Sequence, residues 1–325
     1  MNNIMNKILN CDDIWKYIII PYIGPRLFRC SELRSVSTRF SELFPPCHLK
    51  SKYIKVPSDK YKTLEDAYQY ISDLLYGYCY CSGDYTKPPE IWLDYGIYEN
   101  INNTIRIPVI IRGMGMDRTI IKNGFKFEIN ETWDKYIAPI NPTLEGLSIN
   151  SNGVCKDGIL YSGVNCLYIN SCKIEKCRGF GIKGINIKLN IVNSIICNIK
   201  NIGIHLSYNS IINIDNLEIH NCGLGISIVN LKKKIPSIFN NIKVHHNNCS
   251  GIYLTGWYPD SKIIITGDKT DISFNNLLKQ KSEYGVKSYH SGKIIFKGLD
   301  KNVSRNNYND QNFQTKHGGE IVFTS

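Results

Sequence analysis

The chain lacks the motifs that identify several common classes of protein. No apolar run is long enough to span a membrane, and no apolar signal-peptide segment precedes Asp12 and Asp13. There is no HExxH zinc motif, and Gly113-x-Gly115 is not a nucleotide-binding loop, because Arg118 stands where the third glycine is needed. We therefore expect a protein of the cytoplasm or nucleus, with no membrane partner, metal ion or cofactor.

Cysteine is plentiful, but its spacing does not indicate a metal site. The chain has 12 cysteines, and Cys79-x-Cys81 has no second pair at zinc spacing. Cys177, Cys222 and Cys249 each fall two to four residues before a recurring glycine, a place where a small buried side chain can stack on its neighbour. We expect all of them to be reduced.

Acidic residues are outnumbered, so the formal net charge is +11. The densest basic run, 232–234, lies in an over-long repeat, as is typical of a solvated loop. A nucleic-acid site needs basic residues aligned on successive turns with aromatic residues between them. The sequence does not show that arrangement, so nucleic acid is not an expected partner.

What the chain does contain is a repeat. A Gly-Ile or Gly-Val dipeptide returns at intervals of 22 to 34 residues, and an asparagine precedes several of these glycines by about ten residues. Self-similarity at a fixed period indicates a stacked array. The glycines are Gly158, Gly181, Gly203, Gly225, Gly251 and Gly285, and the asparagines are Asn170, Asn193, Asn216 and Asn241.

The period near 22, with short Ile-, Leu- and Val-rich runs and no helical stretch, predicts a right-handed parallel β-helix over residues 144–325. A leucine-rich repeat would need an L-x-x-L-x-L pattern, which is absent. We expect Ile169, Ile191 and Ile214 to stack in one interior column. The asparagines should form a ladder at the turns, and the glycines should relieve backbone strain at a corner.

Residues 51–143 resemble the opening of pectate-lyase-like β-helix proteins. Thr63 caps a predicted helix with an acidic residue at its third position, and this helix is expected to plug the N-terminal end of the solenoid. The stretch 91–98 then resembles the strand, turn and strand that open the first coil in that family. The segment 105–121 continues this resemblance. The resemblance implies a mainly β fold.

Residues 1–50 differ from the rest and predict three short helices. Asp12 or Asp13 caps the first helix, Pro21 ends it, and Pro45-Pro46 ends the last. So small a module cannot bury all of its own apolar faces. Some of that surface must meet another domain or another protein.

The run from Leu33 to Leu43 resembles the second half of an F-box, although Leu9-Asn10 stands where that family has Leu-Pro. The resemblance implies docking on a Skp1-like subunit of a cullin–RING ubiquitin ligase. The apolar positions that would make this contact are Leu9, Ile14, Trp15, Ile18, Leu33, Val36, Phe40 and Leu43. The Asn-, Ile-, Lys- and Tyr-rich composition also resembles that of proteins of amoeba-infecting giant DNA viruses, which implies the host cytoplasm.

These observations predict a non-enzymatic adaptor that recruits an unknown protein target through a β-helix face and is monomeric outside the ligase. Two alternatives stay open: a glycan-binding or polysaccharide-cleaving β-helix, and a structural or virion protein. Catalysis is not expected, because the acids look sparse and out of phase, with Asp215 and Glu218 or Asp268 and Asp271 as the nearest pairs. His220 and His245 are expected to lie outward about 5 Å apart on neighbouring turns, with His246 adjacent.

Overall fold

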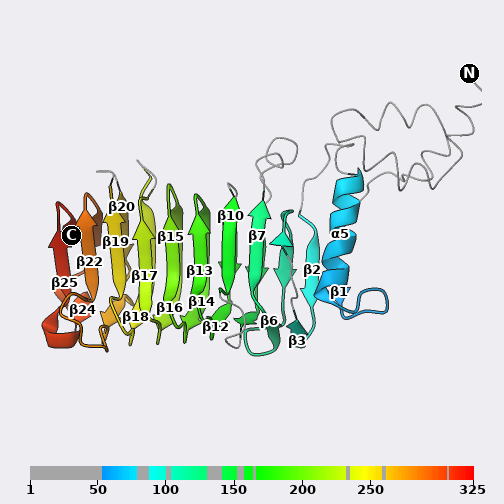
Figure 1. Cartoon of the computed structure of the whole chain (residues 1–325), viewed down its shortest axis with the longest axis horizontal. Coiled ribbons are helices and arrows are strands. Elements are labelled where there is room, and N and C mark those ends of the chain that lie inside the picture. The colour runs from blue at the N-terminus through cyan, green and yellow to red at the C-terminus, as the bar shows by residue number, and fades with distance from the viewer. Residues whose placement is uncertain are drawn as a thin grey trace, which may run out of the picture.

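The computed structural model describes residues 53–78, 88–99, 104–129, 141–151, 157–163, 166–231, 235–257, 261–305 and 307–325. The expected F-box-like module at 1–50 and all eight of its predicted contact positions lie outside these residues. In the described part the chain is a parallel β-solenoid, since every strand pairs with its neighbours in parallel, and Figure 1 shows the resulting rod. The mainly β fold is confirmed.

The strands form a 17-stranded sheet and a nine-stranded sheet. The 17-stranded sheet covers two faces of the rod, and we call the nine-stranded sheet the third face. The first face consists of β1 (Tyr53–Val56), β2 (Glu90–Leu93), β5 (Ile110–Arg112), β8 (Thr143–Glu145), β11 (Cys166–Asn170), β20 (Lys262–Thr266), β23 (Lys293–Lys297), β26 (Glu320–Thr324) and the first halves of β14 (Lys188–Cys197), β16 (Ile211–His220) and β18 (Ser237–His245).

The second face consists of the second halves of these three long strands together with β3 (Gly96–Glu99), β6 (Thr119–Lys122), β9 (Ser148–Asn150), β12 (Lys173–Glu175), β21 (Asp271–Ser273) and β24 (Ser304–Arg305). The third face consists of β4 (Thr104–Ile105), β7 (Phe125–Ile129), β10 (Ile159–Gly163), β13 (Phe180–Ile185), β15 (Ile202–Ser207), β17 (Leu224–Val229), β19 (Ile252–Gly256), β22 (Val286–His290) and β25 (Phe313–Lys316). Helix α5 (Leu64–Tyr78) and the 3₁₀ turns η3 (Lys301–Val303) and η4 (Tyr308–Asp310) complete the elements.

Asparagines bend the long strands from the first face to the second. Asn193, Asn216 and Asn241 each adopt a positive φ in the middle of β14, β16 and β18, a conformation that asparagine tolerates well. The side chain of Asn216 donates to that of Asn193 at 2.8 Å. Asn170 lies outside this pattern: its amide donates to Glu145 at 3.2 Å, and Ser171 takes the positive φ instead.

The repeat glycines allow the backbones of adjacent turns to lie close together. None of the six has a φ in the left-handed region. A Cβ on Gly181 would lie 2.5 Å from the carbonyl oxygen of Gly203, and one on Gly203 would lie 2.6 Å from that of Gly225. The physical reason for glycine here is therefore steric crowding against the next turn. The backbone strain that the sequence suggested plays no part.

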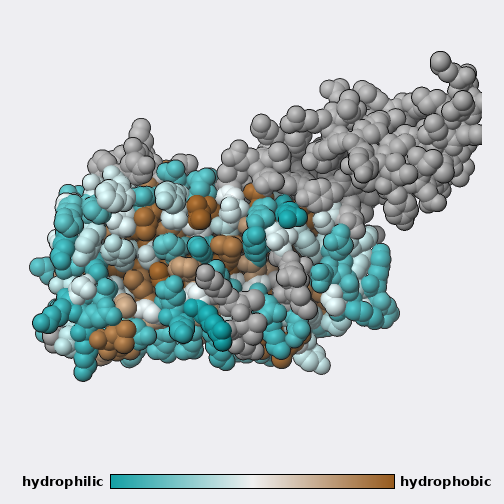
Figure 2. Space-filling model, viewed as in Figure 1, coloured by the Kyte–Doolittle hydropathy of each residue, from teal (hydrophilic) through white to brown (hydrophobic). Residues whose placement is uncertain are grey.

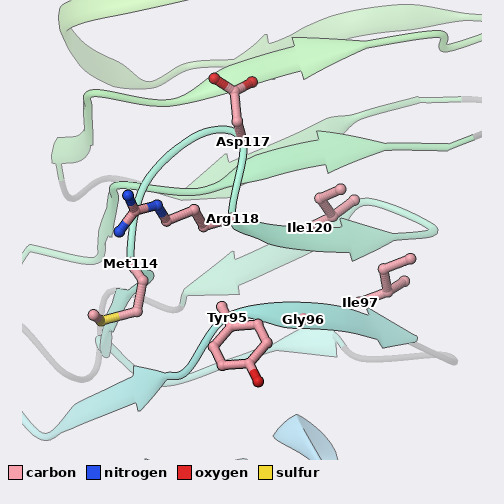
Figure 3. A pocket seen from close by; sticks show the side chains of 7 residues that line it. All are labelled: Tyr95, Gly96, Ile97, Met114, Asp117, Arg118 and Ile120. Carbon is pink, nitrogen blue, oxygen red and sulfur yellow. The ribbon is translucent and has the colours of Figure 1, made fainter.

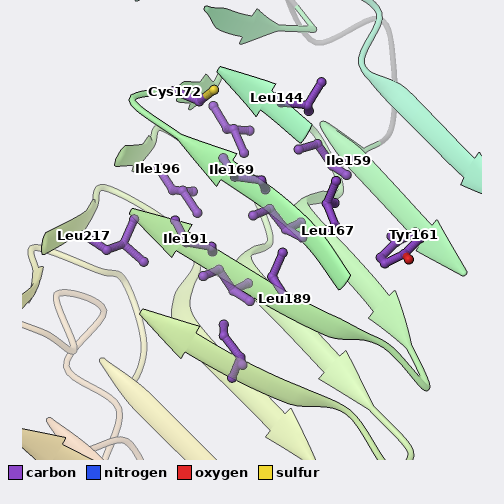
Figure 4. Close-up of a cluster of buried hydrophobic side chains, with 14 of the residues drawn as sticks. Leu144, Ile159, Tyr161, Leu167, Ile169, Cys172, Leu189, Ile191, Ile196 and Leu217 are labelled. Carbon is purple, nitrogen blue, oxygen red and sulfur yellow. The ribbon is translucent and has the colours of Figure 1, made fainter. Parts of the chain in front are cut away.

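The interior is a set of stacked aliphatic columns. Ile169 pairs with Ile191 and Ile191 with Ile214, and all three are buried, which confirms the predicted column. Figure 4 shows such side chains meeting inside the coil, including Leu167 and Leu189 on adjacent turns. Burying these columns requires the winding of the chain, because one turn cannot cover its own apolar face.

Helix α5 lies beside β1 and β2 at one end of the described rod (Figure 1). Asp66 N donates to Thr63 Oγ1 and Thr63 N donates to Asp66 Oδ2, both at 3.0 Å, so the two residues cap the helix start reciprocally. The helix buries Leu64, Ala67 and Ile71 in the common core. Its expected role as a plug stays a prediction. Within the described ranges, neither this nor any other helix is long and apolar enough to cross a membrane.

Candidate acid–base site on the second face

Two columns of mostly polar side chains run along the second face. The parallel register aligns Glu175, Cys197, His220, His245 and Ser273 on successive turns. Their neighbours in sequence, such as Ile219 and Val244, are buried. Because side chains alternate along a strand, the aligned residues point away from the core.

The second column lies two residues earlier on each strand. It aligns Lys173, Ile195, Glu218, Lys243 and Asp271 in that order. Two carboxylates therefore share one column, with a lysine on the turn between them. We call the two columns together the polar strip.

The centre of the polar strip is a carboxylate that faces two imidazoles, and we call Glu218, His220 and His245 the acid–base cluster. Glu218 Oε1 lies 3.2 Å from His245 Nε2 and 3.9 Å from His220 Nε2. The rings of His220 and His245 stack at 5.3 Å with 1° between their planes, which agrees with the spacing expected from the sequence. The carboxylate is therefore within hydrogen-bond distance of His245, and the His220 ring lies just beyond that distance.

The next turn extends the cluster by one more ring. His245 Nδ1 lies 2.8 Å from His246 Nδ1, and the His246 ring stacks on Phe274 at 5.2 Å. The two histidines therefore share a proton on the side that faces away from Glu218. This contact fixes the orientation of the His245 ring.

The charge state of His220 suits proton transfer near neutral pH. Burial lowers the pKa of His220, and the nearby His245 and His246 act in the same direction, while Glu218 opposes them. The imidazole is therefore mostly neutral at pH 7 and can accept a proton. This is the property required of a general base.

Further acids lie on either side of the cluster. Glu175 accepts a hydrogen bond from Asn150 at 3.1 Å and pairs with Lys173 at 3.2 Å. Asp271 accepts from Ser273 Oγ at 3.0 Å through Oδ2 and lies 3.6 Å from Arg305 Nη2 through Oδ1. That Oδ1 atom is buried and accepts no hydrogen bond from any residue that the structure describes.

Glu218 and Asp271 are separated by two turns. Strands in a sheet lie about 4.8 Å apart, so the two backbones are roughly 10 Å apart. Inverting glycosidases hold their two carboxyl groups about 6.5–9.5 Å apart, with room for a water molecule between them. Glu218 leans toward Asp271, to His245 on the intervening strand, and Asp271 contacts Arg305 on the strand beyond.

The acid pairs expected from the sequence are not the pairs that the structure brings together. Asp215 lies on the first face, where it accepts from Asn240 at 2.8 Å, away from Glu218. Asp268 is exposed in the turn before β21. The expectation that the acids are out of phase is wrong for Glu218 and Asp271, and their place two residues before an outward His or Ser could have revealed it.

The third face carries a different arrangement. Figure 2, viewed as Figure 1, shows apolar patches interrupted by polar residues on the face that carries β10, β13 and β15. Trp257 stacks on His290 at 4.2 Å, and His290 stacks on His317 at 5.5 Å. This ring stack contains no carboxylate, so it offers no pair of an acid and a base. In the described ranges no three or more His, Cys, Asp and Glu side chains are grouped as a metal site would require.

The chain matches no protein-family model and no curated protein sequence. Among solved structures it is similar to the catalytic domain of a GH87 α-1,3-glucanase in complex with tetrasaccharides, at 14% identity and a TM-score of 0.50. That likeness covers 84% of this chain and 58% of the glucanase domain, so the chain spans little more than half of its length. A second neighbour is the A-module of the mannuronan C-5 epimerase AlgE4 from Azotobacter vinelandii, at 13% identity, with 73% of this chain and 86% of that module covered and a TM-score of 0.39.

At these identities the comparison shows the fold, a parallel β-solenoid like those of pectate-lyase-like proteins. It also corrects the prediction that the chain is not an enzyme. The solved structure that carries this correction, at a TM-score of 0.50, is the catalytic domain of an α-1,3-glucanase. The sequence did not reveal the shared phase of Glu218 and Asp271, because repeats of unequal length separate them.

Proposed function

We propose that the chain is a polysaccharide-processing enzyme that binds an acidic polysaccharide along its second face and cleaves it at the acid–base cluster. The observation that carries this proposal is the position of Glu218. Its carboxylate faces His245 and His220 on one side, and Asp271 follows two turns further along the same column.

The shape of the polar strip favours a polymer as substrate. The strip runs lengthwise over successive turns of a rigid rod and is open at its sides, whereas sites for small molecules are usually enclosed. The acid–base cluster lies in the middle of the strip. A chain laid along the rod would pass over it.

Basic side chains along the strip favour an acidic substrate. Lys173, Lys243 and Arg305 all belong to the turns that form it, and the formal net charge of the chain is +11. Positive charge at a cleft raises the local concentration of an anionic ligand. Lys243, between the two carboxylates in the register, is the residue that we expect to contact an acidic sugar nearest the cleaved bond.

The cleavage can be written with its atoms balanced. Glu218, supplied with a proton through His245, donates it to the oxygen of the glycosidic bond, and that carbon–oxygen bond breaks. Water attacks the sugar carbon from the opposite side and gives a proton to Asp271, whose side chain is 33% exposed. After each cycle Asp271 releases that proton to solvent, and Glu218 takes one up from solvent through His245.

Reducing-end assays on polygalacturonate, alginate and an α-1,3-glucan test this proposal. We expect activity on an acidic polymer, and we expect Glu218→Gln and Asp271→Asn each to lower kcat/KM by about 10²–10⁴-fold, the usual contribution of a general acid or base. Asp215→Asn is the matched control, since this acid lies on the same strand as Glu218 but on the first face. A folded protein inactive on every polymer, or a Glu218→Gln variant as active as the wild type, would sink the proposal.

Docking of residues 1–50 on a Skp1-like subunit, and recruitment of a target to a ligase, remain predictions from the sequence alone. A structural role in a virion has the same standing. Neither is needed by the acid–base cluster, and no contact among the described residues favours either one.

A further inference from the structure

We infer that a hollow at the N-terminal end of the second face is a sugar-binding subsite that holds the same polysaccharide at a distance from the cleaved bond. The inference rests on the proposed function and extends it, since it sets the minimum length of a chain that occupies both places. The hollow has a volume of about 460 Å³ and is lined by Tyr95, Gly96, Ile97, Met114, Asp117, Arg118 and Ile120.

The lining of the hollow combines an exposed apolar floor with charged groups. Tyr95 is 77% exposed, Ile97 62% and Met114 52%, so three large side chains with apolar surface border the hollow. Figure 3 shows Ile97 and Ile120 side by side on adjacent strands, with Asp117 and Arg118 on the turn that leads into β6. Apolar walls with a few polar groups are typical of small-ligand sites.

This chemistry suits a sugar ring. A pyranose has a face of C–H groups that packs on an aromatic ring, and its hydroxyl or carboxylate groups lie around the edge. The exposed ring of Tyr95 offers the aromatic surface. Arg118 can bind a carboxylate with two parallel hydrogen bonds, and Asp117 can accept from hydroxyls.

The hollow is held in shape before any ligand binds. Gly96 N donates to Arg118 O at 2.8 Å, which ties the turn of one coil to the next. Met114 N donates to Thr119 Oγ1 at 2.9 Å, and that hydroxyl donates to Asp94 O at 3.0 Å. A Cβ placed on Gly115 would meet nothing within 4 Å, so the turn borders open space.

The register joins the hollow to the acid–base cluster. Ile97 and Ile120 line the hollow, and the same outward column continues through Ser148, Lys173 and Ile195 to Glu218. Four strand spacings separate Ile120 from Glu218, which is about 19 Å along the rod. A short oligosaccharide bound at the cluster cannot reach the hollow, whereas a longer one can.

The test measures kcat/KM for oligogalacturonides or oligomannuronates from the disaccharide to the octasaccharide, whichever series the wild type cleaves. We expect Tyr95→Ala to lower kcat/KM about tenfold for the longest members, the loss of one good aromatic contact, and to leave the shortest unchanged. Arg118→Ala should act in the same way. Tyr208→Ala is the matched control, because Tyr208 is 62% exposed and lies off the second face, in the turn before β16.

The outcomes separate this inference from the proposed function. An active enzyme whose chain-length dependence is the same in Tyr95→Ala overturns the subsite and leaves the acid–base cluster intact. An inactive protein overturns the proposed function, and the subsite is then decided by NMR titration of the wild type and Tyr95→Ala with the octasaccharides. Binding that Tyr95→Ala abolishes supports the subsite, and no binding by the wild type overturns it.

Discussion

Replacing a repeat glycine tests why glycine is there. A Cβ on Gly203 would lie 2.6 Å from the carbonyl oxygen of Gly225 and 3.0 Å from Ile219 Cγ2, closer than the 3.4 Å at which ordinary contacts begin. The oxygen belongs to the backbone and cannot rotate away, so the two turns must separate. We expect Gly203→Ala to lower the free energy of unfolding by about 1–3 kcal/mol, the usual cost of overfilling a tight core.

A comparison of alanine with asparagine distinguishes crowding from backbone strain. Gly298 has a φ of +67° and open space around it, so alanine there is strained by its backbone, by about 1–2 kcal/mol, and asparagine should be tolerated better. At Gly203 the order should reverse, because asparagine adds more atoms to a crowded place. Urea unfolding of the four variants measures both orders. If asparagine is tolerated better than alanine at Gly203, crowding is not the reason for glycine.

Two further predictions concern titrating groups. Burial holds the pKa of His220 below its usual value. The contribution of His220 to stability is therefore complete above pH ~6.5 and is lost as pH falls below that value. His220→Gln should make thermal unfolding less sensitive to pH between about 6.5 and 5, and an unchanged pH profile would contradict this. Burial raises the pKa of Cys172 and of Cys222 to about 12. Both thiols should therefore resist a thiol reagent at pH 8 until urea unfolds the chain. Mass spectrometry measures the modification, and modification of either cysteine in the folded protein would refute the buried positions.

The fold was readable from the sequence because the core repeats with the chain. A solenoid buries one side chain of each kind per turn, so the period of Ile169, Ile191 and Ile214 in the sequence is also their spacing in space. Asparagine marks the bends of β14, β16 and β18 for a similar reason, since few other residues tolerate a positive φ there. A position that only one or two residue types can occupy therefore shows a regular pattern in the sequence.

Interior polar contacts left a weaker signal. Asn247, Asn275 and Asn307 are all buried on successive turns, and Asn275 joins the other two: its Oδ1 accepts from Asn247 and its backbone N donates to Asn307 Oδ1. The sequence pattern did not predict this ladder. The intervals of 28 and 32 residues depart from the basic period, because turns added to the later coils lengthen the chain between equivalent positions.

The same irregularity explains why the candidate site escaped the sequence analysis, and it bears on how such a site is built. Outward positions on a solenoid are not constrained by the core, so Glu218, Lys243 and Asp271 can change without loss of the fold. Their alignment is set only by the register of buried neighbours such as Ile219, Val244 and Ile272. The core therefore fixes the position of an outward residue along the rod, although it does not determine which residue type occupies that position. A rigid, repetitive core with variable outward columns can therefore hold an acid, a base and a distant sugar contact in line, and the geometry of these contacts depends on the crowded glycines that keep the turns at their spacing.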